Sequence, residues 1–398
     1  MPVSRRSFIA ARVAPFAPAL IAARGLEAEP WQAAPAIGRS SLSGAPEIRI
    51  NSNENPLGPG ASVIEAMLRK CPEAGRYPFN STPDERALTR AIADLFRVKT
   101  ESVVVGAGSQ ELLKSAVRAF TSPERGLVTG FPSFENCPST ARRLGHPVVA
   151  VRVDPAFRLD LDAMADACRG AGLVFLNNPN NPTATVHSGA AVAAFVSRVR
   201  RTSPDTTILI DEAYHDYVTD PAYETAVPLA LETPHVFVTR TFSKAYGMAG
   251  MRVGYAIGRP DTLQPLARLA MPYNVSVFGI AGAIAALHNG MHIAEERARN
   301  TRVRTFTIDA LAGLGCRMTE SQANFLFVDV GRPAKLFRDE CARRGVLVGR
   351  DFPPFEKTHA RISIGTIEEM QQAVPIFREV LRAATAAASG RPGEASWR

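Results

Sequence analysis

The chain has 398 residues, of which 46% are hydrophobic, and its formal net charge is +8. This composition excludes a largely disordered protein, and the length exceeds the roughly 250 to 300 residues that one hydrophobic core supports, so two domains are expected. The 46 basic and 38 acidic residues form no long run of one sign, which argues against a nucleic-acid-binding protein.

The first 30 residues differ in kind from the rest. Two arginines in residues 4–9 (SRRSFI) precede a weakly apolar, alanine-rich stretch over residues 13–23. This pattern is typical of a twin-arginine export signal over residues 1–30 and predicts a periplasmic or exported protein. The alternative is a cytoplasmic protein in which the two arginines occur by chance. The stretch is shorter than the roughly 20 apolar residues of a stable membrane span.

Residues 31–46 are rich in Ala, Pro, Gly and Ser and predict a linker. Beyond the linker, short apolar runs alternate with amphipathic patterns such as residues 110–120 and 189–200. The candidate strands are residues 103–105, 127–129, 148–151, 174–176, 208–210, 236–238 and 253–257. The alternation predicts an α/β fold with a mostly parallel sheet covered by helices, in a large domain over residues 76–285.

The pattern changes after residue 272. An alanine-rich helical region over residues 280–310 comes before candidate strands at residues 325–330, 346–348 and 362–364 and a closing helix over residues 367–387. These elements predict a smaller C-terminal α/β domain over residues 286–390, on which residues 47–75 are expected to pack. The five cysteines are scattered and have no metal-ligand spacing, so no metal site is expected.

Polar motifs follow several of the predicted strands. They are residues 105–111 (VGAGSQE), 177–183 (NNPNNPT), 210–214 (IDEAY) and 239–252 (TRTFSKAYGMAGMR). Taken singly, they are compatible with a tight turn, a rigid loop, a helix cap and a solvated lysine. The dinucleotide pattern G-x-G-x-x-G is incomplete, because Glu111 stands at the third glycine. Open α/β sheets bind ligands at the carboxyl ends of their strands, so the motifs predict one shared site.

With residues 51–56 (NSNENP) and 360–366 (ARISIGT), the order and spacing of these motifs resemble the fold-type I aminotransferases, and within them the histidinol-phosphate aminotransferases. The resemblance extends over residues 51–365. It implies an aspartate aminotransferase-like fold, pyridoxal 5'-phosphate as the cofactor, and a homodimer with shared active sites.

The resemblance also implies a reaction. An amino group would pass between an amino acid or amino-alcohol phosphate, with histidinol phosphate as the leading donor, and a 2-oxo acid such as 2-oxoglutarate. An aromatic or other amino acid remains an alternative donor. A lyase or decarboxylase of the same fold is a second alternative, because the cofactor motifs do not decide which bond of the substrate breaks.

The same resemblance assigns chemical roles to four residues. Lys244 would hold the cofactor as a Schiff base and move a proton at the substrate's α-carbon. Asp211 would pair with the pyridine nitrogen and keep it protonated. Tyr214 and Asn181 would hydrogen-bond the 3'-oxygen of the ring.

Other residues would position the cofactor. Its phosphate would be held by Gly108, Ser109, Gln110, Thr241, Ser243 and Arg252. Phe134 would stack on the ring, where histidinol-phosphate enzymes usually have tyrosine. Tyr77 would reach the phosphate in the neighbouring subunit.

Three residues are implied to bind substrate: Arg361 as the anion clamp, Arg350, and Asn53. Arg350 has an alternative interpretation as a surface salt bridge with Asp351. One position departs from the family pattern: Ala184 stands where glycine is usual, so a turn that favours positive φ carries a Cβ.

Overall fold

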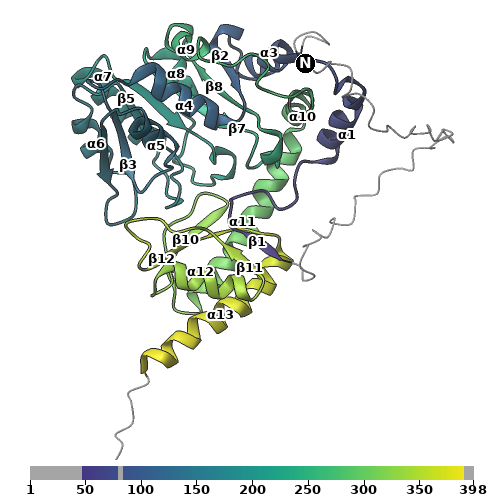
Figure 1. Ribbon diagram of the computed structural model, residues 1–398, viewed down its shortest axis with the longest axis vertical. Coiled ribbons are helices and arrows are strands. Elements are labelled where there is room, and N and C mark those ends of the chain that lie inside the picture. The colour runs from purple at the N-terminus through teal and green to yellow at the C-terminus, as the bar shows by residue number, and fades with distance from the viewer. Residues whose placement is uncertain (1–46, 79–83, 390–398) are drawn as a thin grey trace, which may run out of the picture. The chain divides into compact units, whose positions relative to one another are not determined.

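The computed structural model describes residues 47–78 and 84–389, all within one structural unit (Figure 1). The predicted export signal over residues 1–30 and the linker over residues 31–46 lie outside the described residues. No single helix in the described part is long and apolar enough to cross a membrane. The pair α10 (Val277–His288) and α11 (Gly290–Ala312) reaches that length and composition only when its two halves, bent by 82°, are counted together.

A seven-stranded sheet lies at the centre of the larger part (Figure 1). Its strands are β2 (Val103–Gly106), β3 (Leu127–Phe131), β4 (Val148–Arg152), β5 (Leu173–Asn177), β6 (Thr207–Asp211), β7 (Val236–Thr241) and β8 (Gly254–Gly258). They lie in the order β2-β8-β7-β6-β5-β3-β4, and β8 alone runs antiparallel to its neighbours. The predicted mostly parallel sheet is therefore confirmed.

The strand β5 shows why these apolar runs form a sheet with two covered faces. All five of its residues are buried. Leu173 and Phe175 pack in the core on one face, and Val174 and Leu176 pack in the core on the other. Successive side chains of a strand point to opposite faces, so a continuous apolar run suits a strand that helices cover on both sides.

Helices cover both faces of this sheet. One core receives side chains from α1 (Ala61–Arg69), α3 (Asp84–Phe96), α6 (Leu161–Ala167), α7 (Gly189–Thr202), α8 (Val227–Glu232) and α10. The other receives side chains from α4 (Ser109–Phe120), α5 (Asn136–Arg143) and α9 (Pro260–Ala267). Single turns of 3₁₀ helix are η1 (Cys71–Glu73), η2 (Thr100–Ser102), η3 (His215–Tyr217) and η4 (Ala249–Met251).

Two smaller sheets share a third core. The strands β9 (Arg317–Met318), β10 (Phe325–Asp329) and β12 (His359–Ser363) form an antiparallel sheet, and β1 (Ile48–Ile50) pairs in parallel with β11 (Val346–Val348). The helices α11, α12 (Ala334–Arg343) and α13 (Ile367–Ser389) supply the remaining side chains of this core.

Two expectations need correction. The helical region expected over residues 280–310 divides at Asn289, whose backbone is not helical and whose side chain accepts a hydrogen bond from His292 N as the cap of α11. The segment 47–75 does not pack as a whole on the smaller part. Its strand β1 pairs with β11, but α1 packs against α10 and places Val63 in a core of the large sheet.

Candidate functional site

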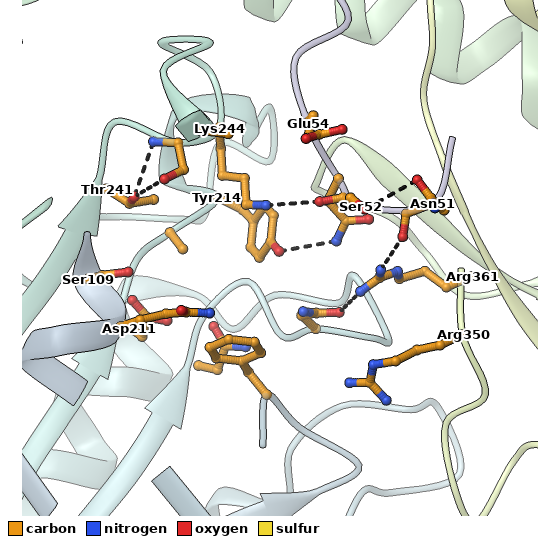
Figure 2. A pocket seen from close by; sticks show the side chains of 18 of the residues that line it. Asn51, Ser52, Glu54, Ser109, Asp211, Tyr214, Thr241, Lys244, Arg350 and Arg361 are labelled. Atoms are coloured by element: carbon orange, nitrogen blue, oxygen red, sulfur yellow. Dashed lines mark hydrogen bonds between the residues drawn. The ribbon is translucent and has the colours of Figure 1, made fainter. Parts of the chain in front are cut away.

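A cavity of about 610 Å³ lies where β5, β6 and β7 end, and Asn177, Asp211 and Thr241 at these strand ends line it. Its other walls come from the loop after β1 and from residues near β11 and β12. Of the predicted site residues, Asn53, Ser109, Gln110, Phe134, Asn181, Asp211, Tyr214, Thr241, Ser243, Lys244, Arg252, Arg350 and Arg361 line this cavity. Figure 2 shows Ser109, Thr241 and Asp211 on one side, Arg350 and Arg361 on the other, and Lys244 and Tyr214 between them.

One end of the cavity has the chemistry of an anion cradle. Gly108 precedes α4 with φ +73°, and a Cβ on it would lie 2.3 Å from Arg252 Nη2, so the guanidinium lies directly against this glycine. Arg252 Nη1 donates to Ser243 Oγ at 3.3 Å, and Thr241 Oγ1 donates to the same oxygen at 3.0 Å. Ser109, the first residue of α4, completes this end, where free backbone N–H groups favour an anion.

Asp211 lies at the base of the cavity and is 2% exposed. Thr239 Oγ1 donates to its Oδ1 at 2.8 Å from the neighbouring strand, where the two residues are register partners. Burial raises the pKa of the Asp211 carboxyl to about 7, although the hydrogen bond from Thr239 acts in the opposite direction. A cationic N–H placed beside this carboxyl would keep it ionised.

Lys244 follows β7 and reaches the middle of the cavity (Figure 2). Its Nζ donates to Ser52 O at 3.2 Å and lies 5.7 Å from the centre of the Tyr214 ring. Burial lowers the pKa of Lys244 to about 8, and the positive charge of Arg361 acts in the same direction. A lysine with such a pKa is a nucleophile near neutral pH.

Tyr214 is held from the opposite wall. Asn53 Nδ2 donates to Tyr214 Oη at 3.1 Å, and Asn53 Oδ1 accepts from Ser363 Oγ at 2.8 Å. Asn53 has φ 54° and is buried, so these contacts fix its side chain in place. Burial raises the pKa of Tyr214. Asn53, which is expected to contact substrate, thus lines the cavity and also orients Tyr214.

Arg361 lies on the side of the cavity away from the anion cradle and is 7% exposed. Its Nη1 donates to Asn181 Oδ1 and its Nη2 donates to Asn51 O, both at 2.8 Å. The guanidinium also lies over the Phe352 ring, 4.8 Å from its centre. Burial lowers the pKa of Arg361 to about 10. This arrangement leaves a charged, oriented group for an anion in the cavity.

Arg350 lines the cavity beside Arg361, and its alternative interpretation as a salt bridge with Asp351 is wrong. The Asp351 carboxylate accepts from Arg338 at 2.7 Å, and Arg350 contacts only the backbone carbonyl of Asp351, at 3.0 Å. The ion pair of Arg350 is instead with Glu135. Arg350 and Asp351 are thus neighbours in the chain, but their side chains have different partners.

Two predicted residues are placed differently from the rest. Gly108 shapes the anion cradle through its close approach to Arg252 and is not itself part of the cavity wall. Tyr77 lies outside the cavity, is 67% exposed, and packs its ring 5.1 Å from that of Tyr273. The expected positive φ at Ala184 is present, at 61°.

Several contributors to the site were not expected from the sequence. They include the backbone carbonyls of Asn51 and Ser52 and the side chain of Thr239. A carbonyl has no sequence signature. Thr239 does have a sequence signature. It is a hydroxyl residue directly after the predicted strand over residues 236–238, which is the next predicted strand after Asp211.

The residues fit pyridoxal phosphate. The anion cradle around Gly108 and Arg252 suits a phosphate, the buried carboxyl of Asp211 suits a protonated ring nitrogen, and the amine of Lys244 suits an aldehyde. All three lie in or against one cavity large enough for the cofactor and a small substrate.

The chain is similar to known aminotransferases. The family model described as aminotransferase class I and II matches residues 45–377. A histidinol-phosphate aminotransferase of Symbiobacterium thermophilum is 36% identical over 85% of this chain and 90% of its own. An aromatic amino acid aminotransferase of Cutibacterium acnes is 33% identical over 87% of this chain and 96% of its own.

A solved structure is also similar. It is the histidinol-phosphate aminotransferase of Sinorhizobium meliloti in complex with pyridoxal-5'-phosphate. The two structures superpose with a TM-score of 0.78, at 28% sequence identity, over 84% of this chain and 91% of that one.

Proposed function

The chain belongs to the class I and II aminotransferases, which use pyridoxal 5'-phosphate, and from this premise we propose that it transfers the amino group of histidinol phosphate to a 2-oxo acid such as 2-oxoglutarate. The observation that carries the proposal is the pair of arginines, Arg361 and Arg350, on the side of the cavity away from the anion cradle. Two guanidinium groups suit substrates with a phosphate or two carboxylates.

Different residues of the cavity would have different roles in transamination. When bound, pyridoxal phosphate supplies an electron sink that stabilises negative charge at the donor's α-carbon. Lys244 Nζ, about half neutral at pH 8, would take the proton from the donor's α-carbon and deliver it to the cofactor, and in the second half-reaction it would move a proton from the cofactor to the acceptor's carbon. Asp211 would keep the ring nitrogen protonated, and Arg361 would bind the anionic group of the donor or of the acceptor.

An aromatic amino acid is the second candidate donor. Aromatic amino acid aminotransferases are 33% identical to the chain over most of their length. Phe134 and Val348 line the same cavity as Arg350 and Arg361, so an aromatic side chain would find apolar surface in the cavity.

The test is the absorption spectrum of the purified protein during a titration with donors. Histidinol phosphate is expected to bleach the wild-type cofactor band at lower concentration than phenylalanine, and 2-oxoglutarate is expected to restore the band. Lys244→Ala should show neither change, whereas Lys335→Ala, on an exposed i,i+4 pair with Asp339, should behave as wild type. Preference for phenylalanine would support the second candidate, and no response to any amino donor would exclude both.

The active form is a homodimer in this proposal. The rings of Tyr77 and Tyr273 are tilted against each other with their centres 5.1 Å apart, and the side chains of Tyr77 and Met271 are 67% and 64% exposed. An interface would cover exposed apolar side chains of this kind. If Tyr77 completes the partner's site, mixing Lys244→Ala with Tyr77→Ala subunits leaves one intact site per mixed dimer. Roughly a quarter of wild-type activity is then expected, from random pairing of subunits. Activity no greater than the sum of the parents would contradict a shared site.

Export by the twin-arginine route is also part of the proposal. It is supported by Arg5 and Arg6 ahead of the apolar stretch of residues 13–23. Replacing both arginines with lysine is expected to leave the protein in the cytoplasmic fraction of a host with this pathway. Equal distribution of wild type and variant between the fractions would refute the export signal.

A further inference from the structure

The ion pair of Glu135 and Arg350 joins segments that are 215 positions apart. Glu135 directly follows Phe134, which lines the cavity, and precedes α5 beside the large sheet. Arg350 lies two residues beyond β11, and its own side chain lines the cavity. The pair therefore bridges the two walls at the end of the cavity that is away from the anion cradle.

The three arginines at this end have different partners. Arg361 is buried and held by the neutral groups of Asn181 and Asn51. Arg338 is neutralised by the Asp351 carboxylate at 2.7 Å. Among the described residues, the carboxylate that pairs with Arg350 is that of Glu135.

The ion pair between Glu135 and Arg350 can be broken at little cost when another anion competes for the guanidinium. Their side chains are 44% and 49% exposed, and ion pairs at such exposure contribute little to stability. A second anionic group on a substrate can therefore replace Glu135 on Arg350. The anionic group must break the ion pair with Glu135 to reach the guanidinium, and this competition weakens its binding.

We infer that Glu135 is a specificity-determining residue, which weakens the binding of substrates with a second anionic group relative to those with an uncharged aromatic end. An aromatic end leaves the ion pair intact. It meets the apolar surface of Phe134 and Val348, which line the cavity. The inference rests on the proposed function, since it concerns which substrates that same cavity selects.

The test compares two unreactive acids that differ in the group opposite their shared carboxylate. Glutarate carries a second carboxylate, and 3-phenylpropionate carries a phenyl ring. Each is titrated into the cofactor-loaded enzyme by calorimetry. Glu135→Gln is expected to bind glutarate roughly three- to tenfold more tightly than wild type does, while 3-phenylpropionate changes by less than about twofold.

Two further variants make the result specific. Glu320→Gln removes a carboxylate from an exposed pair with Arg158 outside the cavity, and it should change neither affinity. In an Arg350→Gln background, Glu135→Gln should improve glutarate binding by less than about twofold, because the competition for the guanidinium is gone.

Equal changes for both acids, or an undiminished gain without Arg350, would overturn the inference. Transamination by the wild-type enzyme is measured in parallel. If transamination proceeds but Glu135→Gln does not change the affinity for glutarate, the role of Glu135 is refuted and the proposed function stands. If no donor reacts with any variant, the proposed function itself fails.

Discussion

Gly108 and Arg252 are in such close contact that no other residue type fits at position 108 without moving the guanidinium. A Cβ on Gly108 would lie 2.3 Å from Arg252 Nη2, and the φ of Gly108 is +73°. The glycine is therefore required for two separable reasons, one conformational and one steric.

Gly108→Ala is expected to weaken the binding of pyridoxal phosphate by at least about tenfold, because the methyl group displaces Arg252 from the cradle. Equilibrium dialysis of the cofactor against the apoenzyme measures this. The matched control is Gly170→Ala, where φ is +74° and nothing lies within 4 Å of the added Cβ. The control also places a Cβ at positive φ, at a cost of about 1 kcal/mol, and should leave the affinity unchanged. Equal losses in both variants would show that strain, and not the displaced arginine, is responsible.

The amine of Lys244 should become reactive with a midpoint near pH 8. Burial lowers its pKa to about 8, so half of it is neutral at that pH, against roughly 0.3% of an ordinary lysine. The rate of apoenzyme modification at Lys244 by trinitrobenzenesulfonate should rise up to about pH 9 and then level off. Mass spectrometry reports Lys335, which is exposed, in the same sample as an internal standard. A midpoint near 10.5 for Lys244 would contradict the effect of burial.

Asp211→Asn should impair the reaction far more than it impairs cofactor binding. The amide cannot stabilise a protonated ring nitrogen, so kcat is expected to fall by about 10² to 10⁴. The anion cradle is intact in this variant, and the dissociation constant for the cofactor should change by less than about tenfold. Asp160→Asn, at the cap of α6, gives the same chemical change outside the cavity and should leave both quantities at their wild-type values. Parallel loss of binding and turnover would argue that Asp211 mainly holds the cofactor in place.

Arg361→Lys should lower kcat/KM by about 10- to 100-fold for both the donor and 2-oxoglutarate. An ammonium group cannot keep the hydrogen bonds to Asn181 and Asn51 and also offer a planar edge to an anion. Arg304→Lys is the control, since Arg304 is also buried and donates to Ala323 O at 3.0 Å, outside the cavity. Loss of kcat/KM in the control as large as that in Arg361→Lys would indicate a general effect of disturbing a buried arginine.

The large sheet and most of the cavity could be predicted from the sequence because their signals are local. Residues 173–176 of β5 are all apolar, which is typical of a strand covered on both faces, and the polar motif over residues 177–183 follows them directly. The break at Asn289 was missed because the alanine-rich residues on both sides favour helix. The cap that divides α10 from α11 depends on one side chain.

The partner of Arg350 could not be predicted in the same way. Asp351 is adjacent in the chain, but its carboxylate pairs with Arg338, while the Arg350 guanidinium reaches Glu135. Closeness in sequence is therefore a poor guide to the partner of this arginine. A contact between residues 215 positions apart leaves no local signature.

The pairing of β1 with β11 has a consequence for the order in which the protein is made. Asn53 depends on Ser363, 310 positions later, and the Asn51 carbonyl depends on Arg361. Nearly the whole chain must therefore leave the ribosome before the segment with Asn53, which hydrogen-bonds Tyr214, can adopt its native contacts. The large sheet can form earlier, from contacts within residues 103–258. The cavity can therefore be completed only late in synthesis, and a chain truncated before residue 361 would lack the arginine that holds Asn51 and Asn181.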